Sequence, residues 1–283
     1  MALNSINTNS GAVVALQSLN RTNAQLDVAQ KRVSTGFRVA DARDDGGAFA
    51  VAQKVRGDIA GVTSANEQLG AAKGLIDTTL SGLNRISETM AAVRGVLVKL
   101  ADENVTGTLR LSYESQYDQL RSQVATFVND STYNGVTLLG TSAVGGGTAE
   151  AGTAITVIRN ERGGTLSLDG QEINDLDLSE IPADSAEATT YLTTDADTGL
   201  SALEGRVNAA LNQYGNMSRV LTNQIGFNKD KIDALESGLG SLIDADIAKE
   251  AARLQSLQIR QQLGATALSA ANSAPQFLLS LFR

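Results

Sequence analysis

Two apolar stripes, one at each end of the chain, constrain the fold more than any other feature of the sequence. Both advance in steps of three or four residues, a spacing typical of helices wound around a partner helix. The N-terminal stripe consists of Ala12, Leu16, Leu19, Asn23, Leu26, Gln30, Val33 and Phe37. The C-terminal stripe consists of Ile243, Ile247, Ala251, Leu254, Leu257, Gln261, Gly264, Leu268, Ala271, Pro275, Leu278 and Phe282.

The position of these stripes decides between two interpretations. A single amphipathic helix usually faces an ordinary globular core. Two matching stripes at opposite ends of one chain favour pairing of the termini and self-assembly. Within the first stripe, the polar Asn23 is expected to cost stability and to fix the register of the helix pair.

The charges of the chain are concentrated in its middle. Residues 1–20 and 261–282 carry no charge, whereas ten acidic residues and no basic residue lie between Arg162 and Arg206. The charge of this segment, −10, exceeds the net charge of −8 of the whole chain. Charged groups need water, whereas uncharged faces can be desolvated. We therefore predict that the two ends become buried in an assembly and that the acidic middle faces solvent.

The residue types that the chain lacks exclude several kinds of chemistry. With no His and no Cys, it has no Ser-His-Asp triad, no Cys nucleophile, no His-based metal site and no disulfide. The net charge of −8 argues against nucleic acid as a partner, because phosphates require a basic face. We predict no catalytic, cofactor or metal site, although a glycosidase-like pair of carboxylates stays open as an alternative.

No segment is uninterrupted and apolar enough to cross a membrane, so no membrane is expected as a partner. The first 20 residues also lack the basic and apolar regions of a cleaved signal peptide.

Composition and local signals predict a mainly helical fold. Aromatic residues make up only 4%, Trp is absent and Pro occurs twice, which suits long helices packed through small side chains. Helices are expected over about 48–101, 107–130 and 201–238, the last starting at the capping-box pair Ser201 and Glu204 and breaking near "SGLGS". The Asn-Gly in "STYNGVTLLG" predicts a turn, and "TAITVIRNERGGTLSLDG" predicts a β-hairpin turning at Gly163 and Gly164.

The segment "STGFRVADARDDGGAFA" is expected to break the helical pattern, with Gly36 as a helix C-cap. Its acidic residues Asp41, Asp44 and Asp45 could suggest a cation site. The spacing of an EF-hand loop is missing, however, which favours a structural turn.

Four glycines in the long central helix form two pairs, 57/61 and 70/74, with GxxxG spacing. The pairs predict either close approach of a neighbouring helix or local bending without further consequence. In a soluble helix the spacing does not decide between the two, since it is diagnostic only in apolar membrane spans.

Four stretches of the sequence resemble the bacterial flagellins. "SINTNSGAVVALQSLN", "KRVSTGFRVADARDDGGAFAVAQK" and "YNGVTLLG" resemble the N-terminal conserved half of that family. "DADIAKEAARLQSLQIRQQLGATALSAANSAPQFLLSLFR" resembles its C-terminal half. The likeness covers about 1–140 and 200–283, and the short middle indicates the compact flagellins of alphaproteobacteria. Gly46-Gly47 depart from the Ala-rich residues that are common in the family, which leaves open where the next helix begins.

The resemblance implies a mainly α fold, a long antiparallel helical bundle or coiled coil of the two terminal arms with a small central region containing a β-hairpin. It divides the chain into an N-terminal arm of the inner filament core (1–40) and an N-terminal helical part of the outer core (41–140). A short, variable, β-rich surface region (141–199) follows. The last two parts are a C-terminal helix of the outer core (200–240) and a C-terminal arm of the inner core (241–283).

The function implied is that of a structural subunit that polymerises into the flagellar filament for swimming motility. Expected partners are further copies and paralogous flagellins, the flagellar type III export apparatus, the filament cap and the hook-associated proteins. The expected location is extracellular, in the filament, without a cleaved signal peptide. Two alternatives stay open, a hook–filament junction protein and a secreted coiled-coil adhesin.

The stripes and the resemblance together give a candidate polymerisation interface. It consists of Ile6, Val13, Leu16, Leu19, Asn23, Leu26, Val33, Ile247, Leu254, Leu257, Gln261, Gly264, Leu268, Asn272, Leu278, Leu279, Leu281 and Phe282.

Overall fold

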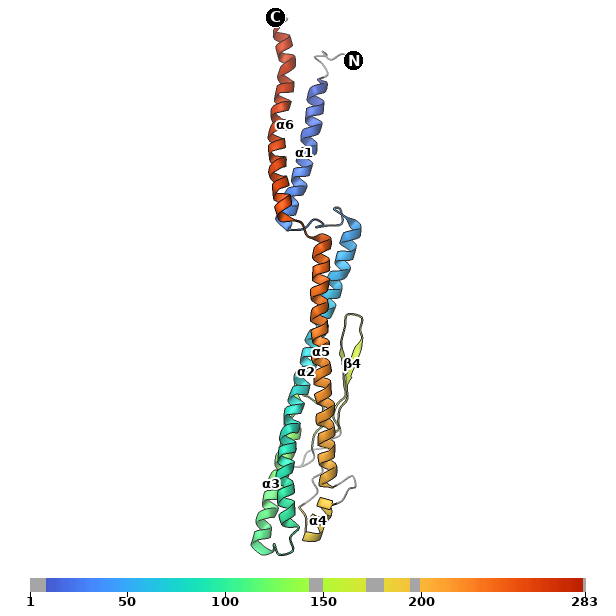
Figure 1. Cartoon of the computed structure of the whole chain (residues 1–283), viewed down its shortest axis with the longest axis vertical. Coiled ribbons are helices and arrows are strands. Elements are labelled where there is room, and N and C mark those ends of the chain that lie inside the picture. Colours follow the sequence, from blue (N-terminus) through green and yellow to red (C-terminus); the bar gives the residue numbers. More distant parts are fainter. Residues whose placement is uncertain (1–8, 143–149, 172–180, 194–198, 282–283) are drawn as a thin grey trace. The chain divides into compact units, whose positions relative to one another are not determined.

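The computed structural model describes residues 9–142, 150–171, 181–193 and 199–281, with side chains up to residue 273. These residues form a mainly helical fold, as predicted (Figure 1). The helices are α1 (Ser10–Thr35), α2 (Gly46–Leu100), α3 (Gly107–Asp130), α4 (Ser185–Thr193), α5 (Leu200–Ile243) and α6 (Ile247–Leu281). The strands are β1 (Thr132–Tyr133), β2 (Val136–Thr137), β3 (Ile155–Ile158) and β4 (Thr165–Leu168).

The chain divides into two compact units. The arm unit combines Met1–Gly57 with Ala234–Arg283, and the body unit spans Asp58–Asp233. The arm unit holds α1, α6, the start of α2 and the end of α5. The body unit holds α3, α4, both hairpins and most of α2 and α5. The five-part division expected from the sequence stays a prediction.

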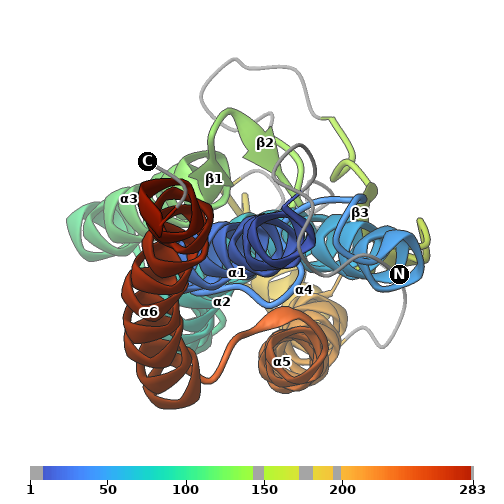
Figure 2. The ribbon, with the colours of Figure 1, turned by 90° about the horizontal axis from the view of Figure 1, so that it is seen from above.

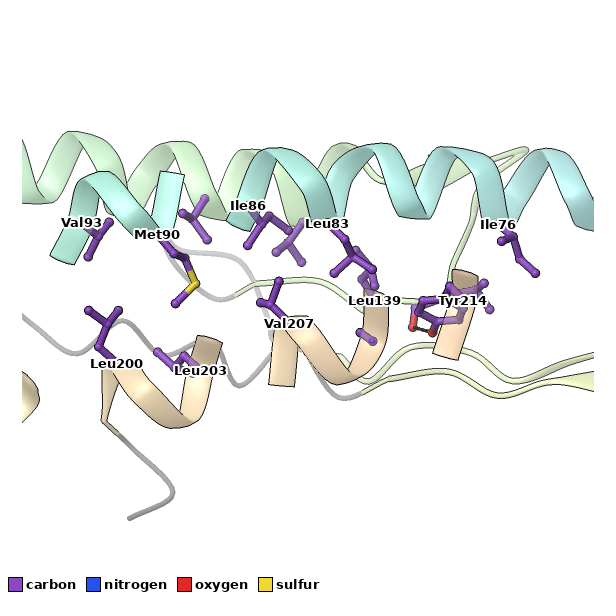
Figure 3. Close-up of a cluster of buried hydrophobic side chains, with 14 of the residues drawn as sticks. Ile76, Leu83, Ile86, Met90, Val93, Leu139, Leu200, Leu203, Val207 and Tyr214 are labelled. Carbon is purple, nitrogen blue, oxygen red and sulfur yellow. Dashed lines mark hydrogen bonds between the residues drawn. The ribbon is translucent and has the colours of Figure 1, made fainter. Parts of the chain in front are cut away.

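A third heptad, which was not predicted from the sequence, builds the core of the body unit. Along α2 the buried side chains follow one another at steps of three and four residues, as Leu69, Ala72, Ile76, Thr79, Leu83, Ile86, Met90, Val93, Leu97 and Leu100. Leu200, Leu203 and Val207 of α5 pack against this stripe (Figure 3). The one hydroxyl in the stripe is satisfied, since Thr79 Oγ1 donates to the backbone oxygen of Leu75 at 2.9 Å.

The two β-hairpins belong to the body unit. Asn134 and Gly135 both have positive φ, 53° and 77°, which is the two-residue turn predicted from their Asn-Gly sequence. In the second hairpin β3 pairs antiparallel with β4, and Gly163 in its loop has φ 76°. The predicted turn and hairpin are therefore both confirmed.

The hydroxyl of Tyr214 on α5 anchors the segments that follow both hairpins. The hydroxyl of this buried residue lies 3.1 Å from the carbonyl oxygen of Leu138 and 3.1 Å from that of Asp169, residues that directly follow β2 and β4. Burial raises the pKa of the Tyr214 hydroxyl well above its ordinary value, so it stays protonated and able to donate.

The hairpins, and not a second helix, approach the predicted glycine pairs. A Cβ at Gly61 would lie 3.0 Å from Cβ of Glu161, beside the loop of the second hairpin. A Cβ at Gly74 would lie 3.1 Å from the ring of Tyr133 in the first hairpin. Gly57 and Gly70 have no such neighbour within 4 Å. Close approach thus explains one glycine of each pair.

Helix α5 does not break at "SGLGS", contrary to the prediction, but continues to Ile243. Leu239 and Leu242 from its last turns pack with buried Val39, Ala52 and Ile243 in a small core of the arm unit. A glycine inside a helix costs about 1 kcal/mol relative to alanine. Burial of each apolar side chain is worth more, about 1.5–3 kcal/mol.

The predicted capping box at the start of α5 is also wrong. The helix starts at Leu200, and the carboxylate of Glu204 forms a two-bond ion pair with Arg94 of α2. Sequence reasoning instead missed α4 in the region expected to be β-rich. The sequence did contain a signal for the start of this helix, the capping-box pair Asp184 and Glu187. In the structure the Asp184 carboxylate accepts from the amide of Glu187 at 2.7 Å, and the Glu187 carboxylate accepts from the amide of Ala183 at 2.7 Å.

Candidate assembly surface of the terminal arms

Helices α1 and α6 lie side by side and run antiparallel in the arm unit (Figures 1 and 2). The side chains between them follow the predicted stripes closely on α6, where Leu257 is buried and Leu254, Gln261, Gly264, Leu268 and Ala271 are half-buried. On α1, Ala12, Leu19, Asn23, Leu26 and Val33 are half-buried, as expected.

Two positions of the N-terminal stripe were assigned to the wrong face. Leu16 and Gln30 are exposed, and the neighbouring alanines Ala15 and Ala29 turn inward instead. Ala29 is 1% exposed. Small side chains at this seam let the two helix backbones come close. The small size of Ala15 and Ala29 therefore decides which residues face the partner helix here, and not the greater apolarity of Leu16.

Three polar contacts set the register of the pair. Asn23 Oδ1 accepts from Gln261 Nε2 at 2.9 Å near its middle. Arg32 Nη1 donates to Glu250 Oε1 at 3.1 Å near one end, and Asn9 Nδ2 donates to the carbonyl oxygen of Ala271 at 2.7 Å near the other. Asn23, predicted to fix the register, thus has a hydrogen-bond partner, Gln261, at the matching position of α6.

Gly264 lets α1 approach α6 closely. A Cβ at this position would lie 3.2 Å from Cδ1 and 3.8 Å from Cβ of Leu19. The first distance is tighter than an ordinary van der Waals contact, so the absence of a side chain at Gly264 creates the space that Leu19 fills.

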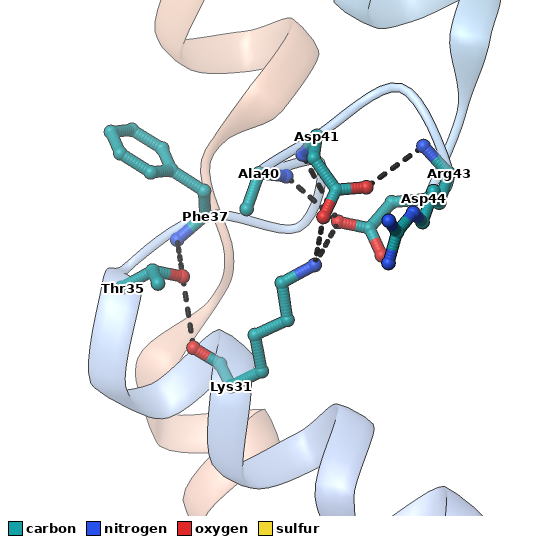
Figure 4. Close-up of polar contacts among 7 residues, drawn as sticks. All are labelled: Lys31, Thr35, Phe37, Ala40, Asp41, Arg43 and Asp44. Carbon is teal, nitrogen blue, oxygen red and sulfur yellow. Dashed lines mark hydrogen bonds and ion pairs between the residues drawn. The ribbon is translucent and has the colours of Figure 1, made fainter.

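The turn after α1 is held by charges and caps (Figure 4). Gly36, with φ 76°, donates to Arg32 O and ends α1, which confirms the predicted C-cap. The carboxylates of Asp41 and Asp44 accept from Lys31 Nζ at 2.8 and 2.9 Å. Asp45 Oδ1 accepts from the amide of Ala48 at 3.0 Å and so caps the N-terminus of α2, which starts at Gly46.

Hydrogen bonds from Lys31 are the main cause that lowers the pKa of both Asp41 and Asp44, and bonds from the same carboxylates raise the pKa of Lys31. The three predicted turn residues are therefore engaged in ion pairing and helix capping. Among the residues with described positions, no group of three or more acidic side chains is arranged to hold a metal ion.

The arms also carry large apolar side chains that the α1–α6 seam leaves in water. On α1 these are Val13, Val14, Leu16 and Val28, between 44% and 65% exposed. On α6 they are Ile247, Ile259 and Leu263, between 46% and 63% exposed. Exposed apolar side chains on both paired helices are candidates for contact with another protein chain.

The candidate interface residues fall into three groups. Those facing the partner helix are Leu19, Asn23, Leu26, Val33, Leu254, Leu257, Gln261, Gly264 and Leu268, and those left exposed are Val13, Leu16, Ile247 and Asn272. Ile6 and Phe282 lie outside the described residues. Leu278, Leu279 and Leu281 lie on α6, beyond the last described side chain. Val14, Val28, Ile259 and Leu263 were missed because they lie outside the two stripes.

No helix within the described ranges is long and apolar enough to span a membrane.

Comparison with known proteins identifies the class of structure to which these arms belong. The family model of the bacterial flagellin N-terminal helical region matches residues 6–143, and that of the C-terminal helical region matches residues 186–282. Flagellin FljM of Caulobacter vibrioides is 35% identical and flagellin FljK of the same organism 33% identical, each over the full length of both chains. A flagellin of Brucella melitensis is 30% identical over 99% of each chain.

The fold is also similar to that of a putative flagellar hook-associated protein from Vibrio parahaemolyticus. The TM-score is 0.54, with 14% identity, over 71% of this chain and 100% of that chain. At this identity the likeness shows the fold alone.

The chain is thus a structural component of the bacterial flagellum. More particularly, it belongs to the bacterial flagellins, of the short type found in alphaproteobacteria, and is a subunit of the flagellin polymer that forms the filament for motility.

Proposed function

We propose that copies of this chain pack against one another in the filament through the exposed apolar faces of α1 and α6. The observation that carries the proposal is the set of seven large apolar side chains that the α1–α6 pair leaves in water. Full burial of an exposed side chain of this size is worth about 1.5–3 kcal/mol, and covering the half that is still exposed would gain part of that amount for each. The seam residues act indirectly, because they hold the two helices in the register that presents these faces.

The thin core of the arm pair supports this assignment. Of the described side chains on α1 and α6, the buried ones are Ala29, Glu250 and Leu257. A helix pair that buries so little of its own surface gains most of its stability from other contacts. Contacts with further copies, or with paralogous flagellins, would supply that stability.

Membership of the family supports a proposal for the remaining partners. We propose that the chain reaches the cell exterior through the flagellar type III export apparatus, without a cleaved signal peptide. At the growing filament it would meet the cap and the hook-associated proteins. The uncharged first 20 residues and the matched arms support this proposal.

A single substitution on the exposed face of α1 tests the interface. Leu16→Asp places a charge on the proposed contact, and Asn84→Asp places the same charge at an exposed position of α2 in the body unit, outside the arm surface. In seeded polymerisation followed by sedimentation, Leu16→Asp should raise the critical concentration at least about tenfold. Asn84→Asp should stay within about twofold of wild type. Equal behaviour of the two variants would show that this face of α1 is not buried in the filament.

A further inference from the structure

The body unit contains an apolar pocket that its own side chains leave open. The pocket has a volume of about 240 Å³ and lies between α2 and the two hairpins. Leu75, Tyr133, Val136, Ile155 and Val157 contribute to its lining.

The walls of the pocket are fixed in place. Leu75, Val157 and Leu168 belong to the buried core, and the ring of Tyr133 rests on Gly74. The hydroxyl of Tyr214 holds the residues that follow each hairpin. The buried part of the lining is therefore held by the core of the unit, and Tyr133 forms its exposed edge. An apolar cavity of about 150 Å³ already accommodates a benzene ring, so 240 Å³ provides room for a phenylalanine side chain.

A matching apolar projection lies on α5 of the same unit. Phe227 is 61% exposed and Val220, seven residues earlier on the same helix face, is 47% exposed. Asn228 fixes the rotation of the helix here, since its Nδ2 donates to Asn66 Oδ1 at 2.9 Å and to the carbonyl oxygen of Arg159 at 3.0 Å. With Asn228 held against α2 and the second hairpin, the neighbouring Phe227 is directed into solvent.

Within one chain the pocket and the projection do not meet. The pocket lining comes from α2 and the hairpins and includes no residue of α5. A protein that carries a pocket on one surface and a complementary projection on another can form a heterologous contact between copies. Such a contact produces an open series of copies where the rotation from one copy to the next does not close a ring. The chain is a subunit of such a polymer.

We propose that the pocket receives Phe227, with Val220 at its edge, from a neighbouring copy of this chain in the filament. The contact joins one body unit to another and is independent of the proposed arm surface. Failure of either proposal would leave the other intact, because the substitutions that test them lie on different units.

Substitutions on the two sides of the contact test the pairing. Phe227→Ala removes the projection, and Ala71→Phe, at an exposed position of the pocket lining, fills the pocket from its own chain. Each single variant should raise the critical concentration for seeded polymerisation about tenfold to a hundredfold. The double variant should be no worse than the worse single variant, because either change alone already abolishes the contact. Circular dichroism of the monomers should match that of wild type.

Lys229→Ala is the matched control, because Lys229 is exposed on α5 two residues from Phe227 and so points to another side of the helix. It should polymerise as wild type does. Wild-type polymerisation of Phe227→Ala would overturn the proposal. So would a double variant whose defect is the product of the two single defects, since that result means that the two sites act independently.

A cross-link provides a second readout, because the natural chain contains no cysteine. Gln68→Cys places a thiol on the pocket, and Asn223→Cys places one between Val220 and Phe227. Filaments grown from an equal mixture of the two variants and treated with a short thiol-reactive cross-linker should yield a dimer of one copy of each. A mixture of Gln68→Cys with Lys229→Cys should yield at least about tenfold less. Similar yields from both mixtures would place the neighbouring copy elsewhere and refute the docking.

Discussion

At the residue scale, a few side chains with special backbone or capping roles decide where elements begin and end. Gly36, Asn134 and Gly135 adopt positive φ where the sequence predicts it, because the need for that conformation is local. The role of Glu204 could not be predicted in the same way. Its partner, Arg94, lies 110 positions earlier, and a two-bond ion pair outweighs a local cap.

Asp44 provides the pH dependence of the turn between α1 and α2. Its Oδ2 accepts from Lys31 Nζ at 2.9 Å and from the amide of Ala40 at 3.0 Å, and both contacts lower the pKa of the carboxyl group. A folded-state pKa below the unfolded value means that the contribution to stability is present above the ordinary carboxyl pKa. It is lost as the pH falls through the folded pKa. The pKa of Lys31 is raised, so its contribution is complete below its ordinary value and is lost as the pH rises through the higher folded pKa.

We therefore expect the turn to be ordered between about pH 4 and pH 10 and to loosen on either side. The amide resonances of Ala40 and Arg43, followed by NMR against pH, should move at both limits. Asp44→Asn should shift these resonances at neutral pH toward their acid positions and weaken the acid transition. Asp27→Asn removes one charge from an exposed position on α1 and serves as the control. An unchanged acid transition in Asp44→Asn would contradict the role of this carboxylate.

At the scale of elements, the long helices were predictable because their signals repeat over many residues. The expected helix 107–130 coincides with α3, and 48–101 differs from α2 by no more than two residues at each end. The continuation of α5 through "SGLGS" was not predictable, since it depends on Val39 and Ala52, far away in the sequence. The pattern of glycines likewise gave no sign that hairpins, and not a helix, would approach Gly61 and Gly74.

Of the three polar contacts that set the register of the arm pair, the one between Asn23 and Gln261 at its middle should contribute most. Asn23 and Gln261 hydrogen-bond at the half-buried seam, and a shift by one heptad would separate them. Replacing both by Leu should raise the thermal midpoint of the arms, because apolar contacts replace a polar pair, and should admit other registers. The single variant Asn23→Ala should instead lower it, since Gln261 loses its partner.

Engineered cysteines can report the register. At Gly264 and Leu19 the Cβ atoms would lie 3.8 Å apart, which suits a disulfide. Leu19→Cys with Gly264→Cys should therefore oxidise efficiently in the wild-type background, and Leu19→Cys with Ala271→Cys, one heptad away, should not. In the Asn23→Leu/Gln261→Leu background we expect both pairs to form. Oxidation of the in-register pair alone would show that the polar contact does not determine register.

At the scale of the whole molecule, the two units differ in how much apolar surface they bury. The body unit has a continuous core that joins α2, α3, α4, α5 and both hairpins. Among its described side chains, the arm unit has the small cluster at Val39, Ala52 and Ile243 and the thin seam between α1 and α6. The sequence predicted the seam from its heptads. The exposed faces of the same helices could not be predicted, because the pattern of one chain does not contain the positions of its neighbours.

This difference predicts opposite responses to changes in the C-terminal tail and in the acidic middle. Removing Leu278–Arg283 deletes four large apolar residues, each worth roughly 1.5–3 kcal/mol if fully buried. The loss recurs in every copy of the polymer, so polymerisation should fail. The body unit should stay folded, because these residues belong to the arm unit.

Neutralising the acidic middle, by contrast, should leave polymerisation intact. Replacing Glu172, Asp175, Asp177 and Glu180 by Gln or Asn removes four negative charges from a segment expected to face water, and polymerisation should proceed as in wild type. Circular dichroism of the monomers and seeded polymerisation followed by sedimentation compare the two variants directly. A segment whose side chains are solvated before and after assembly should tolerate such changes. Normal filaments from the shortened chain, or none from the neutralised one, would reverse the assignment of the tail to the inside of the filament and of the acidic middle to its surface.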